Sequence, residues 1–202
     1  MTPPKLKKVL SILCGQLSKK GVPHAIIDAM ALSLYGMPRF TADIDLLSDD
    51  LYRKIVLELM KRLGYDCFQD AGNFAQFDSE LGVYGKVDFM FVNTEEGRAI
   101  LGRTVDAKDE AIGLVPVVQP TDYAVLKLMA MANNPERKAR DMADLEILFK
   151  SAAAGFLDTS FQPINVDHLQ KFAGRFHVSK QLASLLPLLG PVKHPHRGKT
   201  DE

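Results

Sequence analysis

The periodicity of the apolar residues changes near residue 119, and this change constrains the possible folds more than any other feature of the chain. Up to residue 118, segments with helical spacing alternate with short apolar or alternating segments that favour β-strands. From residue 121 onward the spacing is helical. We therefore predict an α+β fold: a mixed β-sheet flanked by helices over residues 1–118, followed by a C-terminal helical region over residues 119–186.

The predicted elements are short, and Gly, Pro or Asn residues separate most of them. The predicted helices span 4–20, 28–35, 49–63, 94–102, 121–133, 136–150 and 165–186. The predicted strands lie at 24–27 and 43–47, within 66–92 and within 103–118. Residues 187–202 are rich in Pro, Lys, His and Gly and are predicted to form a flexible tail. A ligand cleft is expected between the sheet part and the helical part.

The charge balance argues against a protein that coats nucleic acid or binds a membrane surface. The 202 residues include 25 Lys and Arg and 25 Asp and Glu, so no net field attracts a polyanion. No apolar run is long enough to span a bilayer, and the N-terminus lacks an apolar signal region. Cys14 and Cys67 lie in apolar segments without metal-ligand spacing and are expected to be reduced core residues. These features predict a cytoplasmic protein.

Three aspartates form the main candidate site. Asp43 and Asp45 are two residues apart on a predicted strand, so both point to one face while Ile44 points into the core. Asp88 is the one charge in the apolar run 87–92. If the two strands are neighbours, the three carboxylates form a cluster suited to Mg²⁺ or Mn²⁺, which prefer oxygen ligands. The alternative interpretation is a solvated edge strand that carries acidic residues without a ligand.

The wider pattern resembles the active-site signature of the polymerase-beta-like nucleotidyltransferase superfamily, and most closely that of the AbiEii toxin-type bacterial nucleotidyltransferases. The matching motif is Gly-x-x-Arg-x-Thr-x-Asp-Ile-Asp, represented by Gly36, Arg39, Thr41, Asp43 and Asp45. Asp88 falls where the group has its third carboxylate. Lys127 and the segment 140–145 resemble the helical half of the group. The resemblance covers about residues 20–150 and is most specific around the aspartate pair.

The resemblance implies a metal-dependent nucleotidyltransferase. Its donor would be an NTP, its acceptor an unidentified RNA, protein or small molecule, and its partner a protein from a toxin–antitoxin pair. The residues implied in metal binding and catalysis are Asp43, Asp45 and Asp88. Those implied in nucleotide binding are Lys127, Arg39, Thr41, Asp28 and Ala29, and those in support of the site are Arg140, Asp141 and Asp144.

One position departs from the group's pattern. Asp28-Ala29 stands where the superfamily has Gly-Gly or Gly-Ser, whose backbone amides approach the triphosphate at a helix N-terminus. Asp28 is expected to cap the helix that follows it, and so to place negative charge where phosphate should bind. This substitution supports a second hypothesis, a catalytically weak or inactive protein that keeps the fold as a binding or regulatory module.

Several residues also have purely structural interpretations. Lys127 either extends to the surface from an apolar helix or points into the cleft toward a phosphate. Arg137–Asp141 and Arg140–Asp144 are spaced as ion pairs on a solvated helix face, although Asp141 could instead position Lys127. Thr41 could simply hydrogen-bond the loop before the strand. A third functional hypothesis is an unrelated metal-dependent phosphohydrolase.

Overall fold

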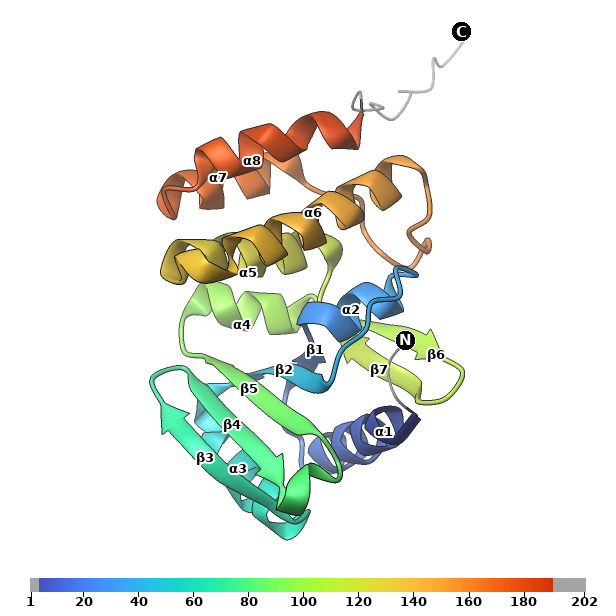
Figure 1. Ribbon diagram of the computed structural model, residues 1–202, viewed down its shortest axis with the longest axis vertical. Helices are drawn as coiled ribbons and strands as arrows, with labels where there is room; N and C mark the ends of the chain where they lie inside the picture. Colours follow the sequence, from blue (N-terminus) through green and yellow to red (C-terminus); the bar gives the residue numbers. More distant parts are fainter. Residues whose placement is uncertain (1–3, 191–202) are drawn as a thin grey trace, which may run out of the picture.

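A mixed seven-stranded β-sheet forms the centre of the computed structural model, which describes residues 4–190 (Figure 1). The strands lie in the order β3-β4-β5-β2-β1-β7-β6. The neighbours β2–β5 and β1–β7 are parallel, and the remaining pairs are antiparallel. The strands are β1 His24–Ile26, β2 Asp43–Asp49, β3 Tyr65–Ala71, β4 Phe74–Ser79, β5 Lys86–Val92, β6 Val105–Asp109 and β7 Gly113–Val117.

The helices fall into two groups along the chain, one in a sheet part and one in a helical part. Those of the sheet part are α1 Pro4–Lys19, α2 Asp28–Leu34, α3 Arg53–Arg62 and α4 Glu95–Gly102. Those of the helical part are α5 Pro120–Asn133, α6 Lys138–Ala153, α7 Val166–Arg175 and α8 Ser179–Leu185. Figure 1 shows the helical part stacked beyond α2 and α4 at one end of the sheet. The mixed α+β fold is therefore confirmed.

One hydrophobic core runs through both parts. Alternate residues of the central strands, including Ile44, Leu46, Val87 and Phe89, are fully buried. Their alternation with polar residues on the other face is the pattern expected of a sheet that has one face in the core. Cys14 lies in this core, whereas Cys67 is exposed on the edge strand β3, so the prediction of a buried Cys67 was wrong.

The strand that carries the first two aspartates is longer than predicted. β2 continues through Ser48 and Asp49, and helix α3 begins only at Arg53, after a 3₁₀ turn, rather than at 49. Asp49 stays in the strand because its carboxylate accepts a 2.7 Å hydrogen bond from Arg98 of α4. The same carboxylate accepts one from the amide of Leu51 at the start of the turn. An ion pair that spans 49 positions has no local signature.

The predicted helix 165–186 is two helices, α7 and α8. His177 lies between them in the left-handed conformation, with φ of 58°. Its amide donates to Gly174 and the amide of Val178 donates to Ala173, the bond pattern of a Schellman helix end. Glycine is the usual residue at such a helix end, so His177 gives no sequence signal of the break.

The end of the described chain is ordered against the helical part. Leu186–Leu189 forms a 3₁₀ turn, with Leu188 and Leu189 packed against the core. Residues 191–202, the rest of the predicted tail, lie outside the described residues. Among residues 4–190, no helix is both long and apolar enough to cross a lipid bilayer.

Candidate active site

The three aspartates lie side by side on the paired strands β2 and β5. These strands are parallel over their whole length, and the register places Asp45 directly opposite Asp88 and Asp43 opposite Lys86. The core residues Ile44 and Val87 point to the other face. The expected adjacency of the two strands is thus present. We call Asp43, Asp45 and Asp88 the acidic cluster.

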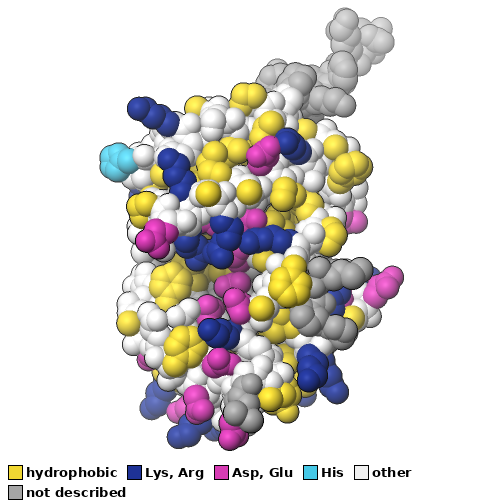
Figure 2. Space-filling view, viewed as in Figure 1, with side chains coloured by type: hydrophobic (Ala, Val, Ile, Leu, Met, Phe, Trp, Pro, Cys, Tyr) yellow, Lys and Arg dark blue, Asp and Glu magenta, His cyan; other side chains and the backbone are white. Residues whose placement is uncertain are grey.

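Two cavities meet at this cluster, and Asp28, Asp45, Asp88 and Arg137 line both. The larger, of about 390 Å³, extends between β4, β5 and α5, and we call it the apolar cavity. The other, of about 350 Å³, is lined mainly by charged and polar side chains, and we call it the polar cavity. Figure 2 shows Asp and Glu gathered beside Lys and Arg across the middle of this face, where the sheet part meets the helical part.

The acidic cluster is electrostatically unbalanced. Burial and the carboxylates of Asp28, Asp88 and Asp43 raise the pKa of Asp45 to about 8. Burial also raises the pKa of Asp88, although Gln76 of β4 donates a 2.8 Å hydrogen bond to its Oδ2. Among residues 4–190, no Lys, Arg or His forms an ion pair with Asp43, Asp45 or Asp88.

Several buried polar atoms beside the cavities have no hydrogen-bond partner among the described residues. They are Asp88 Oδ1, Tyr123 Oη, Arg137 Nε and Asp141 Oδ2. Such atoms are rare in folded proteins and destabilising unless a ligand or water satisfies them. Asp88, Tyr123 and Arg137 line the apolar cavity itself. The set offers acceptors for a cation and donors for an anion.

The donor chemistry of the acidic cluster fits a hard divalent cation, because it consists of carboxylate oxygens and one of them is buried without a partner. In the described part of the chain, no group of three or more His, Cys, Asp or Glu side chains is already arranged to hold a metal ion. The cluster is therefore a set of suitable ligands rather than a finished coordination shell.

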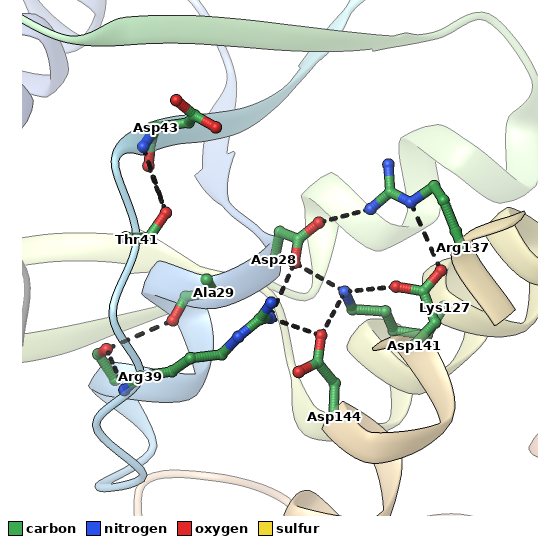
Figure 3. A network of polar contacts seen from close by, with 10 residues as sticks. Asp28, Ala29, Arg39, Thr41, Asp43, Lys127, Arg137, Asp141 and Asp144 are labelled. Atoms are coloured by element: carbon green, nitrogen blue, oxygen red, sulfur yellow. Dashed lines mark hydrogen bonds and ion pairs between the residues drawn. The ribbon is translucent and has the colours of Figure 1, made fainter. Parts of the chain in front are cut away.

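Opposite the acidic cluster, Lys127 of α5 is buried among three carboxylates (Figure 3). Its Nζ donates to Asp28 at 2.7 Å, Asp141 at 2.9 Å and Asp144 at 2.8 Å. Burial alone would lower the pKa of Lys127, but the carboxylates outweigh it and raise the pKa. Lys127 therefore does not extend to the surface, and the suggested contact between Asp141 and Lys127 is present.

Asp28 links the two parts of the molecule. Its Oδ1 accepts from Lys127 and its Oδ2 accepts from Arg137 at 2.9 Å (Figure 3). Burial would raise its pKa, but these cations lower it below the ordinary value. The expected N-cap was wrong: the cap position of α2 is Ile27, and no side chain caps the helix. Asp28 has a φ of 52°, the conformation that favours glycine, and its carboxylate turns from the helix toward the cations.

The other predicted nucleotide-binding residues lie around the same contact. Arg39 Nη1 donates to Asp144 at 2.7 Å and lies 3.8 Å from Asp28 Oδ1. Thr41 Oγ1 donates to the carbonyl of Asp43 and accepts from its amide, the loop bonding considered above. Ala29 is buried beside the polar cavity, and its carbonyl accepts from Ser33.

The charged residues around the start of α6 form the solvated face only in part, because Arg140 is exposed whereas its acidic neighbours are not. Asp141 and Asp144 are buried, and Arg137 Nε lies 3.6 Å from Asp141. The ion pair that the spacing of Arg140 and Asp144 suggested is absent from the described residues. Asp144 instead pairs with Arg39 and Lys127, and Arg140 lines the polar cavity. We call Asp28, Arg39, Lys127, Arg137, Asp141 and Asp144 the ion-pair network.

Sequence reasoning missed two residues of the site. Gln76 contacts Asp88, and the alternation Phe74-Gln76-Asp78 along β4 could have placed it on the cavity face. The contact of Arg137 with Asp28 was also missed, because the two residues are 109 positions apart and no local sequence pattern predicts such a contact.

The model of the family described as "Nucleotidyl transferase AbiEii toxin, Type IV TA system" matches residues 29–188. This match covers more than half of the chain. No curated protein matches.

Solved structures share the fold at low sequence identity. A solution structure of the antibiotic-resistance factor ANT(2″)-Ia is 12% identical, with a TM-score of 0.60 over 89% of this chain and 95% of that one. ANT(2″)-Ia in complex with adenylyl-2″-tobramycin is 11% identical, with a TM-score of 0.60 over 85% and 96%. An antigenic nucleotidyltransferase-like protein from Paracoccidioides brasiliensis is 17% identical, with a TM-score of 0.55 over 89% and 92%.

Proposed function

Because this chain belongs to the AbiEii family of nucleotidyl transferases, we propose that it transfers a nucleoside monophosphate from an NTP to an acceptor hydroxyl with the help of Mg²⁺ or Mn²⁺. The observation that carries the proposal is the placement of Asp43, Asp45 and Asp88 on paired strands, at the meeting point of two cavities. Two cavities suit a reaction with two substrates. The acceptor class, whether RNA, protein or small molecule, is left to experiment.

The acidic cluster would hold the cation, whose positive charge would bring the triphosphate close to the aspartates and polarise the reacting phosphoryl group. Asp43 and Asp45 would supply ligands from β2, and Asp88 would complete the set from β5. Asp88 Oδ1 is buried without a hydrogen-bond partner, so it has a free acceptor site for the cation.

The proposed reaction is an in-line displacement at the α-phosphorus. The acceptor oxygen forms a bond to this phosphorus while the bond to the oxygen that bridges the α- and β-phosphates breaks, and pyrophosphate leaves. Asp88 would take the proton of the acceptor hydroxyl. Arg140, which lines the polar cavity outside the ion-pair network, attracts the negative charge of the phosphates.

Asp28 favours a second candidate function, that of a catalytically weak or inactive binding or regulatory protein. Its carboxylate holds Lys127 and Arg137, two cations that could otherwise bind phosphate. A triphosphate must therefore compete with a carboxylate that already makes good ion pairs. The competition lies at these two side chains rather than at the amides of the helix N-terminus.

Label transfer separates the two candidates. The protein is incubated with Mg²⁺, each NTP labelled at the α-phosphate, and pooled RNA or protein. We expect transfer that is lost in Asp45→Ala and retained in Asp66→Ala, an exposed aspartate on β3 outside both cavities. NTP binding without transfer would select the regulatory candidate. Absence of NTP binding at millimolar concentrations would reject nucleotidyl transfer.

A phosphohydrolase would give a different product in the same assay. It would release inorganic phosphate or a nucleotide without labelling any acceptor. Product analysis by thin-layer chromatography distinguishes the two, because transfer to an acceptor releases pyrophosphate in equal amount.

A further inference from the structure

We propose that Phe74 and Asn133 form the site for the nucleobase of the donor NTP, with Phe74 stacking on the base and Asn133 contacting its edge. This inference rests on the proposed function, because it assigns one end of the apolar cavity to part of the same substrate. Both residues line that cavity, together with side chains of the acidic cluster.

The cavity-facing side of the sheet changes from polar to apolar over one step along each of the strands β4 and β5. On β5 the step leads from Asp88 to Met90, and on β4 it leads from Gln76 to Phe74. The register pairs Asp88 with Gln76 and Met90 with Phe74. Two residues of a strand span about 7 Å, so the apolar end lies within the reach of a nucleoside whose phosphates are at the aspartates.

Helix α5 shows the same division on the side that faces the sheet. Tyr123 and Lys127 line the charged end of the cavity, and Ala130 and Asn133 follow at helical spacing. Asn133 is exposed and lies at the last turn of α5. Its neighbour Asn134 already accepts a hydrogen bond from the amide of Glu136, which leaves Asn133 as the amide suited to a ligand.

The size and the chemistry of the cavity agree with this occupant. A volume of about 390 Å³ falls within the usual range of small-molecule sites. Phe74 is 48% exposed, whereas Phe77, Phe89 and Phe91 of the same sheet are buried in the core. An aromatic ring at the mouth of a cavity is a stacking platform for any base, because every base has a π-face.

The unpartnered polar atoms lie at the opposite end of the cavity. Tyr123 Oη can donate to a phosphate oxygen, and Asp88 Oδ1 can accept a cation. The cavity therefore has a charged end for the triphosphate and its metal and an apolar end for the base. Ribose would span the distance between them.

The absence of tryptophan from the sequence allows a direct optical test. Phe74→Trp places the sole tryptophan, which can be excited selectively over tyrosine, at the proposed stacking position. We expect NTPs with Mg²⁺ to quench its fluorescence and inorganic tripolyphosphate with Mg²⁺ to leave it unchanged. Phe68→Trp on the adjacent strand β3 is the matched control, because Phe68 is 54% exposed and lies outside the cavity. Its fluorescence should not respond.

Binding of non-hydrolysable NTP analogues measures the contributions of the two residues. Phe74→Ala should weaken binding of all four NTPs by about tenfold, since stacking tolerates every base. Phe68→Ala should change none of them. Asn133→Ala should instead alter the order of preference among the four NTPs, because an amide reads donors and acceptors on the base edge.

The outcomes separate this inference from the proposed function. If wild-type protein binds NTPs and Phe74→Ala binds them equally well, without quenching in Phe74→Trp, the base site is wrong and nucleotidyl transfer stands. If wild-type protein binds neither NTPs nor tripolyphosphate with Mg²⁺, both are wrong. Quenching by NTPs together with the tenfold loss supports the base site.

Discussion

The acidic cluster and the ion-pair network face each other across the site and solve the problem of buried charge in opposite ways. In the network, Lys127, Arg137 and Arg39 are matched by Asp28, Asp141 and Asp144 at short distances. The cluster has three carboxylates and no ion-pair partner among the described residues, and burial together with the neighbouring carboxylates raises the pKa of Asp45 to about 8. A balanced group holds a fold together, whereas an unbalanced group is prepared for a ligand that brings the missing charge.

The largest expected effect comes from removing the central cation of the network. Lys127→Met should destabilise the protein by about 3–5 kcal/mol, because it leaves buried carboxylates without a partner. Urea unfolding measures the change. Lys150→Met is the matched control: its exposed pair with Glu146 should contribute no more than about 0.5 kcal/mol. Equal effects of the two substitutions would show that the network is not a buried, balanced group.

The acidic cluster should give a pH dependence that the network does not. The folded-state pKa of Asp45 is about 8, above its ordinary 3.8, so protonation favours the folded state. The stabilisation is complete below pH 4 and is lost as the pH rises through 8, with a slope of at most about 1.4 kcal/mol per pH unit. Unfolding in EDTA between pH 4 and 9 should show this slope in the wild type.

Asp45→Asn should remove most of that slope, and Asp106→Asn, an exposed aspartate of β6, should leave it unchanged. In the wild type, Mg²⁺ should bind more tightly as the pH approaches 8, since its ligands must lose protons. Identical slopes in wild type and Asp45→Asn would remove the proposed contrast between the two groups.

Asp28 belongs to the network but lies where the two groups meet, so its substitution tests their coupling. Asp28→Asn removes the charge and keeps a residue that tolerates positive φ. It should tighten NTP binding by about tenfold, equal to about 1.4 kcal/mol, because one negative charge leaves the site and Arg137 Nη2 loses its carboxylate partner, while Asp141 and Asp144 still hold Lys127. Isothermal titration with Mg²⁺ measures this change.

Asp28→Gly separates charge from backbone strain. It removes the same negative charge and also relieves the left-handed conformation at φ of 52°, which costs a non-glycine residue about 1–2 kcal/mol. It should therefore match Asp28→Asn in NTP affinity and exceed it in stability. Weaker NTP binding by both variants would show that Asp28 helps the nucleotide rather than competing with it.

The smallest expected effect concerns how the acidic cluster is positioned. Thr41→Val removes the two hydrogen bonds that hold the backbone of Asp43 and should lower stability by about 1 kcal/mol. Thr104→Val is the control, because Thr104 bonds the carbonyl of Leu101 far from the aspartates. Only Thr41→Val should also weaken Mg²⁺ binding, and an unchanged Mg²⁺ affinity would assign the positioning of Asp43 to the sheet alone.

Local pattern predicted the acidic cluster better than it predicted the network. The two-residue spacing of Asp43 and Asp45, and the single charge of Asp88 in an apolar run, are properties of single strands. Asp28, in contrast, binds Lys127 and Arg137 from 99 and 109 positions away. Helix-cap rules predicted the wrong role for Asp28 because long-range charges decided its orientation. His177 was missed for a related reason, since its left-handed conformation follows from the packing of α7 on α8 rather than from its residue type.

The register of β2 and β5 makes the crowding of the aspartates a property of the whole sheet. Seven consecutive residue pairs join the strands, and a shift of β2 by one residue would turn Ile44 toward the cavities and Asp43 and Asp45 into the core. The backbone therefore cannot give way to relieve the repulsion between Asp45 and Asp88. Only a mobile species, a proton or a metal ion, can do so, and the choice between them depends on the surrounding solution rather than on any rearrangement of the chain.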